Sequence, residues 1–118
     1  MKWFTAFFYL GLTFLLSFAN PAWGHAVPTE YDPKPDAVVH SVTTISISFD
    51  DELEPTFSTL AVLNDKQQKI ATGSVDSANS KKLSLKTSAL EKGSYNVQWV
   101  AVARDGHRTH GGYNFKVE

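Results

Sequence analysis

Apolar and polar residues alternate in short runs along most of this chain, and turn-forming residues separate one run from the next. Residues 43–49 show the clearest case, with large apolar side chains on one face and hydroxyl side chains on the other. A repeat of two residues is the period of a β-strand that buries one face. The same pattern predicts further strands at 25–31, 58–63, 68–75, 82–86, 94–103 and 113–117.

Seven short strands without a helical period predict an all-β domain, built as an antiparallel sandwich or barrel. Residues 64–67 are expected to form a hairpin turn. Tyr95 follows Leu90 and Gly93 at the start of the longest strand, which resembles the tyrosine corner of Greek-key sandwiches. We therefore expect its hydroxyl to bond back to the preceding loop, and we expect Trp99 to lie at the centre of the core.

The first 24 residues differ from this pattern and have the features of a secretory signal peptide. Lys2 gives a positive start, an apolar run follows, and Ala22 and Gly24 form a small-residue cleavage site. Cleavage after Gly24 makes His25 the first residue of a mature domain that spans residues 25–118. The alternative is an uncleaved membrane anchor, and the short apolar span favours cleavage.

Composition narrows the function classes of the mature chain. Removing 24 of the 118 residues leaves 94, enough for one small domain. The leader carries one Lys and no acid, so ten basic and twelve acidic residues remain, a net charge of −2 with His neutral. Basic residues are neither in excess nor clustered, which excludes a nucleic-acid partner. No second apolar run could span a bilayer, so stable membrane insertion is not expected after cleavage.

Sulfur ligands are missing from the mature chain. The sequence has no Cys, and its single Met is Met1 in the leader. Any metal site must then be built from nitrogen and oxygen. Such a site suits Cu(II), Zn(II) or Ni(II) and disfavours Cu(I), which prefers thiolate and thioether ligands.

Two segments carry residues that can hold such a metal. As a first residue, His25 offers both an α-amine and an imidazole. Asp105 and His107 lie two apart after the longest strand, so in an extended chain they point the same way. The amine, His25, Asp105 and His107 supply three nitrogens and one oxygen, a set that suits Cu(II). The opposing interpretation is that Asp-Gly marks an ordinary turn and that a first-residue His is incidental.

Other histidines and acids are expected to lie at the surface. His110 is three residues beyond His107. We expect it to be exposed to solvent or to lie behind the metal ligands, and we do not expect it to be a ligand itself. His40 precedes a strand without other donors nearby. A short acidic run lacks the glycine and spacing of a calcium loop and is interpreted as a solvated turn. The run consists of Asp50, Asp51, Glu52 and Glu54.

The sequence resembles the CopC family of copper-resistance proteins of bacterial periplasms over essentially the whole mature chain. The matching segments are the His-Ala start, P-x-x-D-A at 33–37, I-S-I-S-F at 45–49, L-x-x-G-x-Y-x-V-x-W at 90–99, D-G-H at 105–107 and G-x-x-F-x-V at 112–117. The resemblance implies an immunoglobulin-like Greek-key β-sandwich. It also implies that His25 (through amine and imidazole), Asp105 and His107 bind one Cu(II) per chain.

Two departures from the family limit what carries over. Some members bind Cu(I) through a Met-rich loop, and no mature methionine is present here, so that site is not expected. The family commonly has Pro after D-G-H, where this chain has Arg108.

The expected function is non-enzymatic. We expect a monomeric periplasmic Cu(II)-binding protein that sequesters copper, supports copper resistance, or delivers copper to a CopD-like inner-membrane transporter. A histidine-brace copper oxidase or monooxygenase is one alternative, and Asp105 argues against it because an anionic ligand stabilises Cu(II). A metal-free immunoglobulin-like interaction module is another, in which His25 and D-G-H are incidental.

Overall fold

Eight β-strands and the turns between them make up residues 25–118, the part of the chain that this computed structural model describes. The strands are β1 (Pro28–Asp32), β2 (Val38–Val39), β3 (Thr44–Phe49), β4 (Thr59–Leu63), β5 (Lys69–Val75), β6 (Lys82–Lys86), β7 (Gly93–Val102) and β8 (Arg108–Val117). Residues 25–118 contain no helix, which confirms the prediction of an all-β domain. The leader predicted at 1–24, with its cleavage site, lies outside the described residues.

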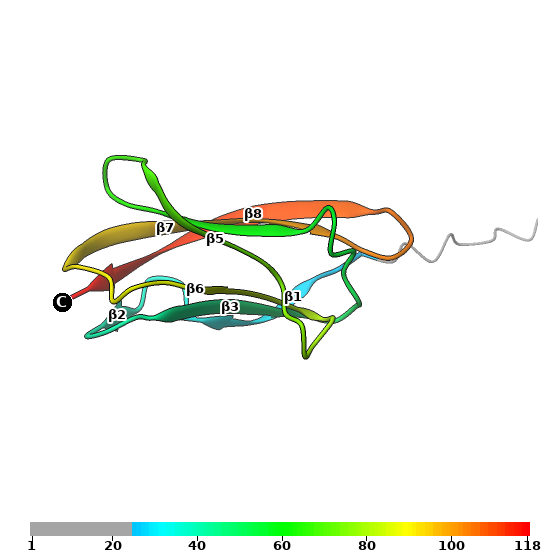
Figure 1. Cartoon of the computed structure of the whole chain (residues 1–118), viewed down its shortest axis with the longest axis horizontal. Coiled ribbons are helices and arrows are strands. Elements are labelled where there is room, and N and C mark those ends of the chain that lie inside the picture. The colour runs from blue at the N-terminus through cyan, green and yellow to red at the C-terminus, as the bar shows by residue number, and fades with distance from the viewer. Residues whose placement is uncertain (1–24) are drawn as a thin grey trace, which may run out of the picture.

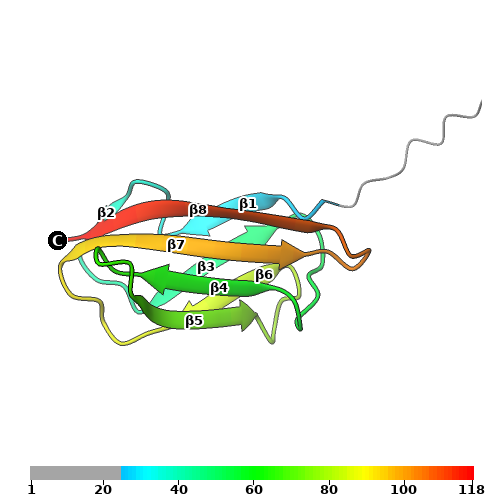
Figure 2. The same ribbon diagram turned by 90° about the horizontal axis from the view of Figure 1, so that it is seen from above.

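The strands pack as a sandwich of two layers (Figures 1 and 2). One layer holds β1, β3 and β6, and the other holds β4, β7 and β8, with β5 pairing to both β6 and β4. Hydrogen-bonded neighbours follow the order β1-β3-β6-β5-β4-β7-β8-β2. All of these pairs are antiparallel except β2 with β8, so the predicted antiparallel sandwich is confirmed.

The core lies between the layers and consists of the faces that the alternation marked as inward. The inward residues of β3 and β7 are at most 7% exposed; they are Ile45, Ile47, Phe49, Tyr95, Val97, Trp99 and Ala101. The Trp99 ring meets the Phe49 ring edge to face, with ring centroids 5.3 Å apart. The Tyr95 hydroxyl donates a hydrogen bond to the Glu91 carbonyl. The expectations for Trp99 and for the tyrosine corner are therefore confirmed.

Most strand boundaries lie within one residue of the sequence prediction, and larger differences occur at β8, β1 and β2. β8 begins at Arg108, five residues before the predicted start at 113. The sequence did not predict this part of the strand, because residues 108–112 are polar or glycine and show no alternation. These residues form a strand because they continue the pairing with β7. In this pairing Gly111 lies opposite Trp99. A Cβ at Gly111 would stand 2.8 Å from the indole Cζ2, so only glycine fits there without a shift. β1 starts at Pro28 instead of 25, and the two-residue β2 was not predicted.

A tyrosine pair joins the two layers beside the core. The rings of Tyr31 on β1 and Tyr113 on β8 meet edge to face at 5.0 Å between centroids. The Tyr113 hydroxyl is buried and has no hydrogen-bond partner among residues 25–118. Burial, and then the nearby charge of Asp32, raises the pKa of this phenol.

Candidate metal centre

A tight loop between β7 and β8 carries two of the predicted site residues. The Ala103 N–H donates to the His107 carbonyl at 2.9 Å, and the Gly106 N–H donates to the Ala103 carbonyl at 2.9 Å. Gly106 has φ 89°, a conformation that side chains disfavour, so glycine suits the loop at this point. The loop is therefore a defined turn that fixes where Asp105 and His107 leave the backbone.

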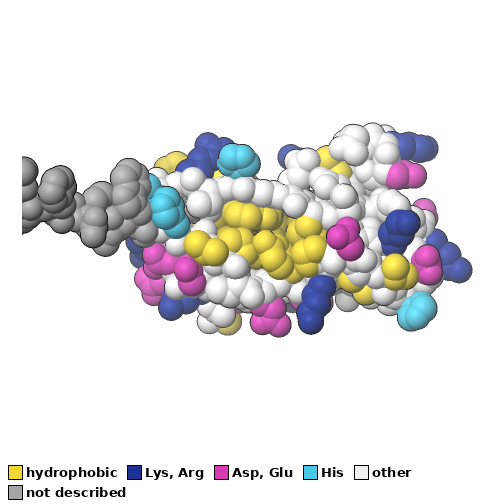
Figure 3. Space-filling view, turned by 180° about the vertical axis from the view of Figure 1, so that it is seen from behind, with side chains coloured by type: hydrophobic (Ala, Val, Ile, Leu, Met, Phe, Trp, Pro, Cys, Tyr) yellow, Lys and Arg dark blue, Asp and Glu magenta, His cyan; other side chains and the backbone are white. Residues whose placement is uncertain are grey.

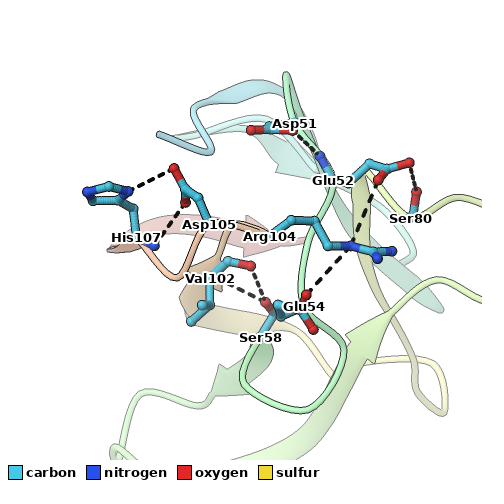
Figure 4. Close-up of polar contacts among 9 residues, drawn as sticks. All are labelled: Asp51, Glu52, Glu54, Ser58, Ser80, Val102, Arg104, Asp105 and His107. Atoms are coloured by element: carbon cyan, nitrogen blue, oxygen red, sulfur yellow. Dashed lines mark hydrogen bonds and ion pairs between the residues drawn. The ribbon is translucent and has the colours of Figure 1, made fainter. Parts of the chain in front are cut away.

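Asp105 and His107 are bonded to each other (Figure 4). Asp105 Oδ1 accepts the backbone N–H of His107 at 3.0 Å, and Asp105 Oδ2 lies 2.8 Å from His107 Nδ1. Both side chains are more than one third exposed. When Nδ1 carries the proton, the carboxylate fixes that tautomer and turns Nε2 to the far side of the ring. Asp105 thus orients His107, a contact that the expectation of a direct ligand did not include.

His25 lies against the same loop. Its ring and that of His107 have centroids 5.5 Å apart and planes at 62°. One residue begins the described chain and the other follows β7, so only the tertiary fold brings them together. The structure therefore places the two predicted imidazoles side by side.

The position of His25 is set by the two residues that follow it. Ala26 is fully buried, and its carbonyl accepts a hydrogen bond from the Thr109 hydroxyl at 3.0 Å. The Val27 N–H donates to Asp50 Oδ1 at 2.8 Å, and the Asp50 N–H donates back to the Val27 carbonyl at 3.0 Å. His25 is thus the neighbour of a buried and doubly bonded anchor. Sequence reasoning missed Thr109 and Asp50, because no local pattern marks a contact with so distant a partner.

The donor set is incomplete in the chain as it stands. No group of three or more His, Asp or Glu side chains within residues 25–118 is arranged to hold a metal ion. The sequence places residues before His25, so its nitrogen belongs to a peptide bond here. The α-amine of the predicted set exists only after cleavage at that bond. The predicted site therefore remains a proposal that the arrangement of His25 and His107 supports.

The acidic run lies beside the loop. Arg104 Nε is 3.8 Å from Glu52 Oε2 and 3.7 Å from Glu54 Oε1, and all three side chains are about one third to one half exposed (Figure 4). Exposed pairs of this kind contribute little to stability. Glu52 and Glu54 are solvated as expected, with Arg104 as their partner, whereas Asp50 departs from the expectation because it bonds to Val27.

The remaining two histidines are exposed. Thr109 and His110 are consecutive in β8, so their side chains leave on opposite faces. Thr109 bonds to Ala26, while His110 is exposed. His40 is exposed near the other end, with Nδ1 3.2 Å from the Glu118 carbonyl. The expectation that both are surface residues is confirmed.

Comparisons with known proteins agree with one another. A family model described as the CopC domain matches residues 28–118. Protein YobA of Escherichia coli strain K12 is 31% identical over 100 residues, which cover 81% of either chain. The crystal structure of CopC from Methylosinus trichosporium OB3b has a TM-score of 0.72 and 25% identity, covering 80% of this chain and 94% of that one. PcoC, a methionine-rich copper resistance protein from Escherichia coli, has a TM-score of 0.66 and 27% identity, covering 80% and 99%. Within residues 25–118 there is no helix long and apolar enough to cross a membrane.

Proposed function

The chain belongs to the CopC family, and we propose that it is a periplasmic copper-resistance protein that binds one Cu(II) per monomer. The observation that carries the proposal is the contact between the imidazoles of His25 and His107, held by the buried Ala26 anchor. Copper is cargo in this proposal and undergoes no chemistry at the site, so the protein is not an enzyme.

Each residue of the proposed site has a separate task. His25 supplies its α-amine and imidazole as a chelate once residues 1–24 have been removed. His107 supplies Nε2, because Nδ1 faces the Asp105 carboxylate. Asp105 supplies negative charge and fixes the His107 ring, and its oxygens retain lone pairs for the metal. The site thus offers nitrogen and oxygen only, which favours Cu(II).

The choice of oxidation state separates this chain from a methionine-rich relative. PcoC is described as methionine rich, whereas this sequence has one Met, at position 1. A Cu(I) site built from thioethers is therefore not proposed. We propose delivery to a CopD-like inner-membrane transporter as the fate of the bound Cu(II).

The α-amine gives the sharpest test. The exported protein is first examined by mass spectrometry to establish that it begins at His25. Cu(II) affinity is then measured by competition with a chelator, for that protein and for a variant with one Ala added before His25. The added residue converts the amine into an amide and should weaken binding by several orders of magnitude. His40→Ala, at the other end, should leave affinity unchanged, and an unaffected Ala-extended variant would refute the proposed site.

One observation keeps a second candidate function open. Both oxygens of the Asp105 carboxylate bond to His107. With this geometry Asp105 does not have to be a metal ligand. Two histidines with an α-amine and no anionic ligand are the donors of a histidine brace. An ascorbate-driven peroxide assay on the Cu(II)-loaded protein decides between the two, since a filled carrier site should give no turnover above that of free copper.

A further inference from the structure

Phe57 is the most exposed large hydrophobic side chain within residues 25–118, at 64%. It belongs to the turn 54–58, which connects β3 to β4 at the same end of the sandwich as the 103–107 loop (Figure 1). Folding gives no reason to place an aromatic ring in water, because such a ring gains most from burial. A partner that covers Phe57 would supply that reason.

The turn that carries Phe57 is fixed to the end of β7. Ser58 is 1% exposed, and its hydroxyl accepts the Val102 N–H at 3.0 Å and donates to the Val102 carbonyl at 3.4 Å. The Glu54 N–H donates to the same carbonyl at 2.7 Å, and the fully buried Leu53 is bridged to Ala103. The turn is thus held at both ends, and binding through Phe57 would require little ordering of the backbone.

Acidic residues predominate in the two segments that meet at this end of the sandwich. Segments 50–58 and 103–107 together hold five acids and one Arg; they are Asp50, Asp51, Glu52, Glu54, Asp105 and Arg104. Figure 3 shows Asp and Glu side chains gathered beside His side chains at the end where the described chain begins. Arg104 lies between two of these acids in exposed pairs. An aromatic anchor with a charged rim is typical of a protein interface.

We propose that segments 50–58 and 103–107 form a docking face for the protein that exchanges copper with this chain, with Phe57 as its anchor. The partner is a protein with an apolar pocket for Phe57 and Lys or Arg side chains around that pocket. This inference rests on the proposed function, because docking here places the partner next to His107. An anionic lipid surface fits less well, since the acidic rim would be repelled by it.

Site-specific photo-crosslinking in cells that export the full chain tests the proposal. A benzophenone amino acid is placed at Phe57 or, as a control, at Val38, which is 55% exposed near the C-terminal end. Position 57 should give a product with one protein that position 38 does not give. The double variant Glu52→Lys/Glu54→Lys should abolish that product. With the crosslinked protein purified, Phe57→Ser should bind it at least about tenfold more weakly, and Lys→Glu changes around its pocket should restore binding to the double variant.

Four results would overturn the docking face. They are equal products from positions 57 and 38, a product containing only a second copy of this chain, a product unaffected by charge reversal, and Phe57-dependent binding to phosphatidylglycerol vesicles. Cu(II) affinity is measured on the same purified variants and should match that of the parent protein. A parent protein that fails to bind Cu(II) refutes the proposed function, whereas normal Cu(II) binding with any of the four results refutes the docking face alone.

Discussion

Replacing Thr109 by Val tests whether the anchor at Ala26 assembles the proposed metal centre. The substitution keeps the branched shape and removes the hydroxyl that donates to the Ala26 carbonyl at 3.0 Å. Ala26 is fully buried, so its carbonyl loses its bond without gaining water. A net hydrogen bond is worth about 0.5–1.5 kcal/mol, and an unsatisfied buried group lies at the upper end of that range or above it.

That free energy translates into a measurable loss of affinity. About 1.4 kcal/mol is tenfold in an equilibrium constant, so Thr109→Val should weaken Cu(II) binding by about tenfold. The reason is that His25 spends less time beside His107, and only the assembled state binds with full affinity. The bonds between Val27 and Asp50 remain in the variant, which keeps the loss near tenfold.

Chelator competition measures the affinity, and electron paramagnetic resonance of the Cu(II) complex reports how many nitrogens remain bound. Thr109→Ser keeps a hydroxyl and should restore both readouts. Thr72→Val is the matched control, because Thr72 is exposed on β5 and pairs with Ala61 away from the loop. Unchanged Cu(II) affinity in Thr109→Val, or failure of Ser to rescue it, would contradict this account of the anchor.

Three further predictions concern the site and the fold. At the proposed site, metal binding would displace protons from the α-amine and the imidazoles, so apparent Cu(II) affinity should rise from about pH 5 to 8. Isothermal titration should show that His107→Ala lowers both the affinity and this pH slope. Asp105→Asn should lower the affinity and leave the slope nearly intact. Tyr113→Phe removes a buried hydroxyl without a partner among residues 25–118, so its melting temperature should equal or exceed the parent's, and a clear decrease would reveal a hidden partner. The hydrogen bond from the Ala78 N–H is the main cause that lowers the pKa of Asp76. The Asp76 carboxylate therefore stabilises the fold above its ordinary pKa near 3.8, and this contribution is lost as the pH falls through the lowered pKa. In acid unfolding followed by circular dichroism, Asp76→Asn should lack this pH-dependent contribution to stability.

Sequence reasoning predicted the parts of the fold in which apolar and polar residues alternate along a single segment. β6 was predicted with its observed bounds, and the inward faces of β3 and β7 were identified, because burial of one face imposes a period of two. The start of β8 was not predicted, since residues 108–112 form a strand because they pair with β7 and not because of their own pattern. A pairing of this kind is a property of two segments, and neither one shows it alone.

The candidate site divides in the same way. Sequence reasoning expected Asp105 and His107 to point the same way along an extended chain, whereas they lie in a tight turn and the carboxylate bonds to the ring. The anchors were not predictable, because Val27 and Asp50 are 23 residues apart and Ala26 and Thr109 are 83 apart. Thr and Asp are common at the surface of β-domains, and only the folded chain shows which of them hold Ala26 and Val27 in place.

Because β7 and β8 pair along their full lengths, the loop between them and the C-terminus lie at opposite ends of the molecule. Val102 lies opposite Arg108 at one end of the pair, and Gly93 lies opposite Val117 at the other. Ten residues of strand span about 30 Å, so the C-terminus is about that far from the loop (Figure 2). A resin, electrode or fluorescent reporter attached after Glu118 would leave the opposite end facing solution, whereas attachment through the nitrogen of His25 would consume a donor of the proposed site. Immobilised protein for metal-exchange measurements should therefore be tethered at Glu118.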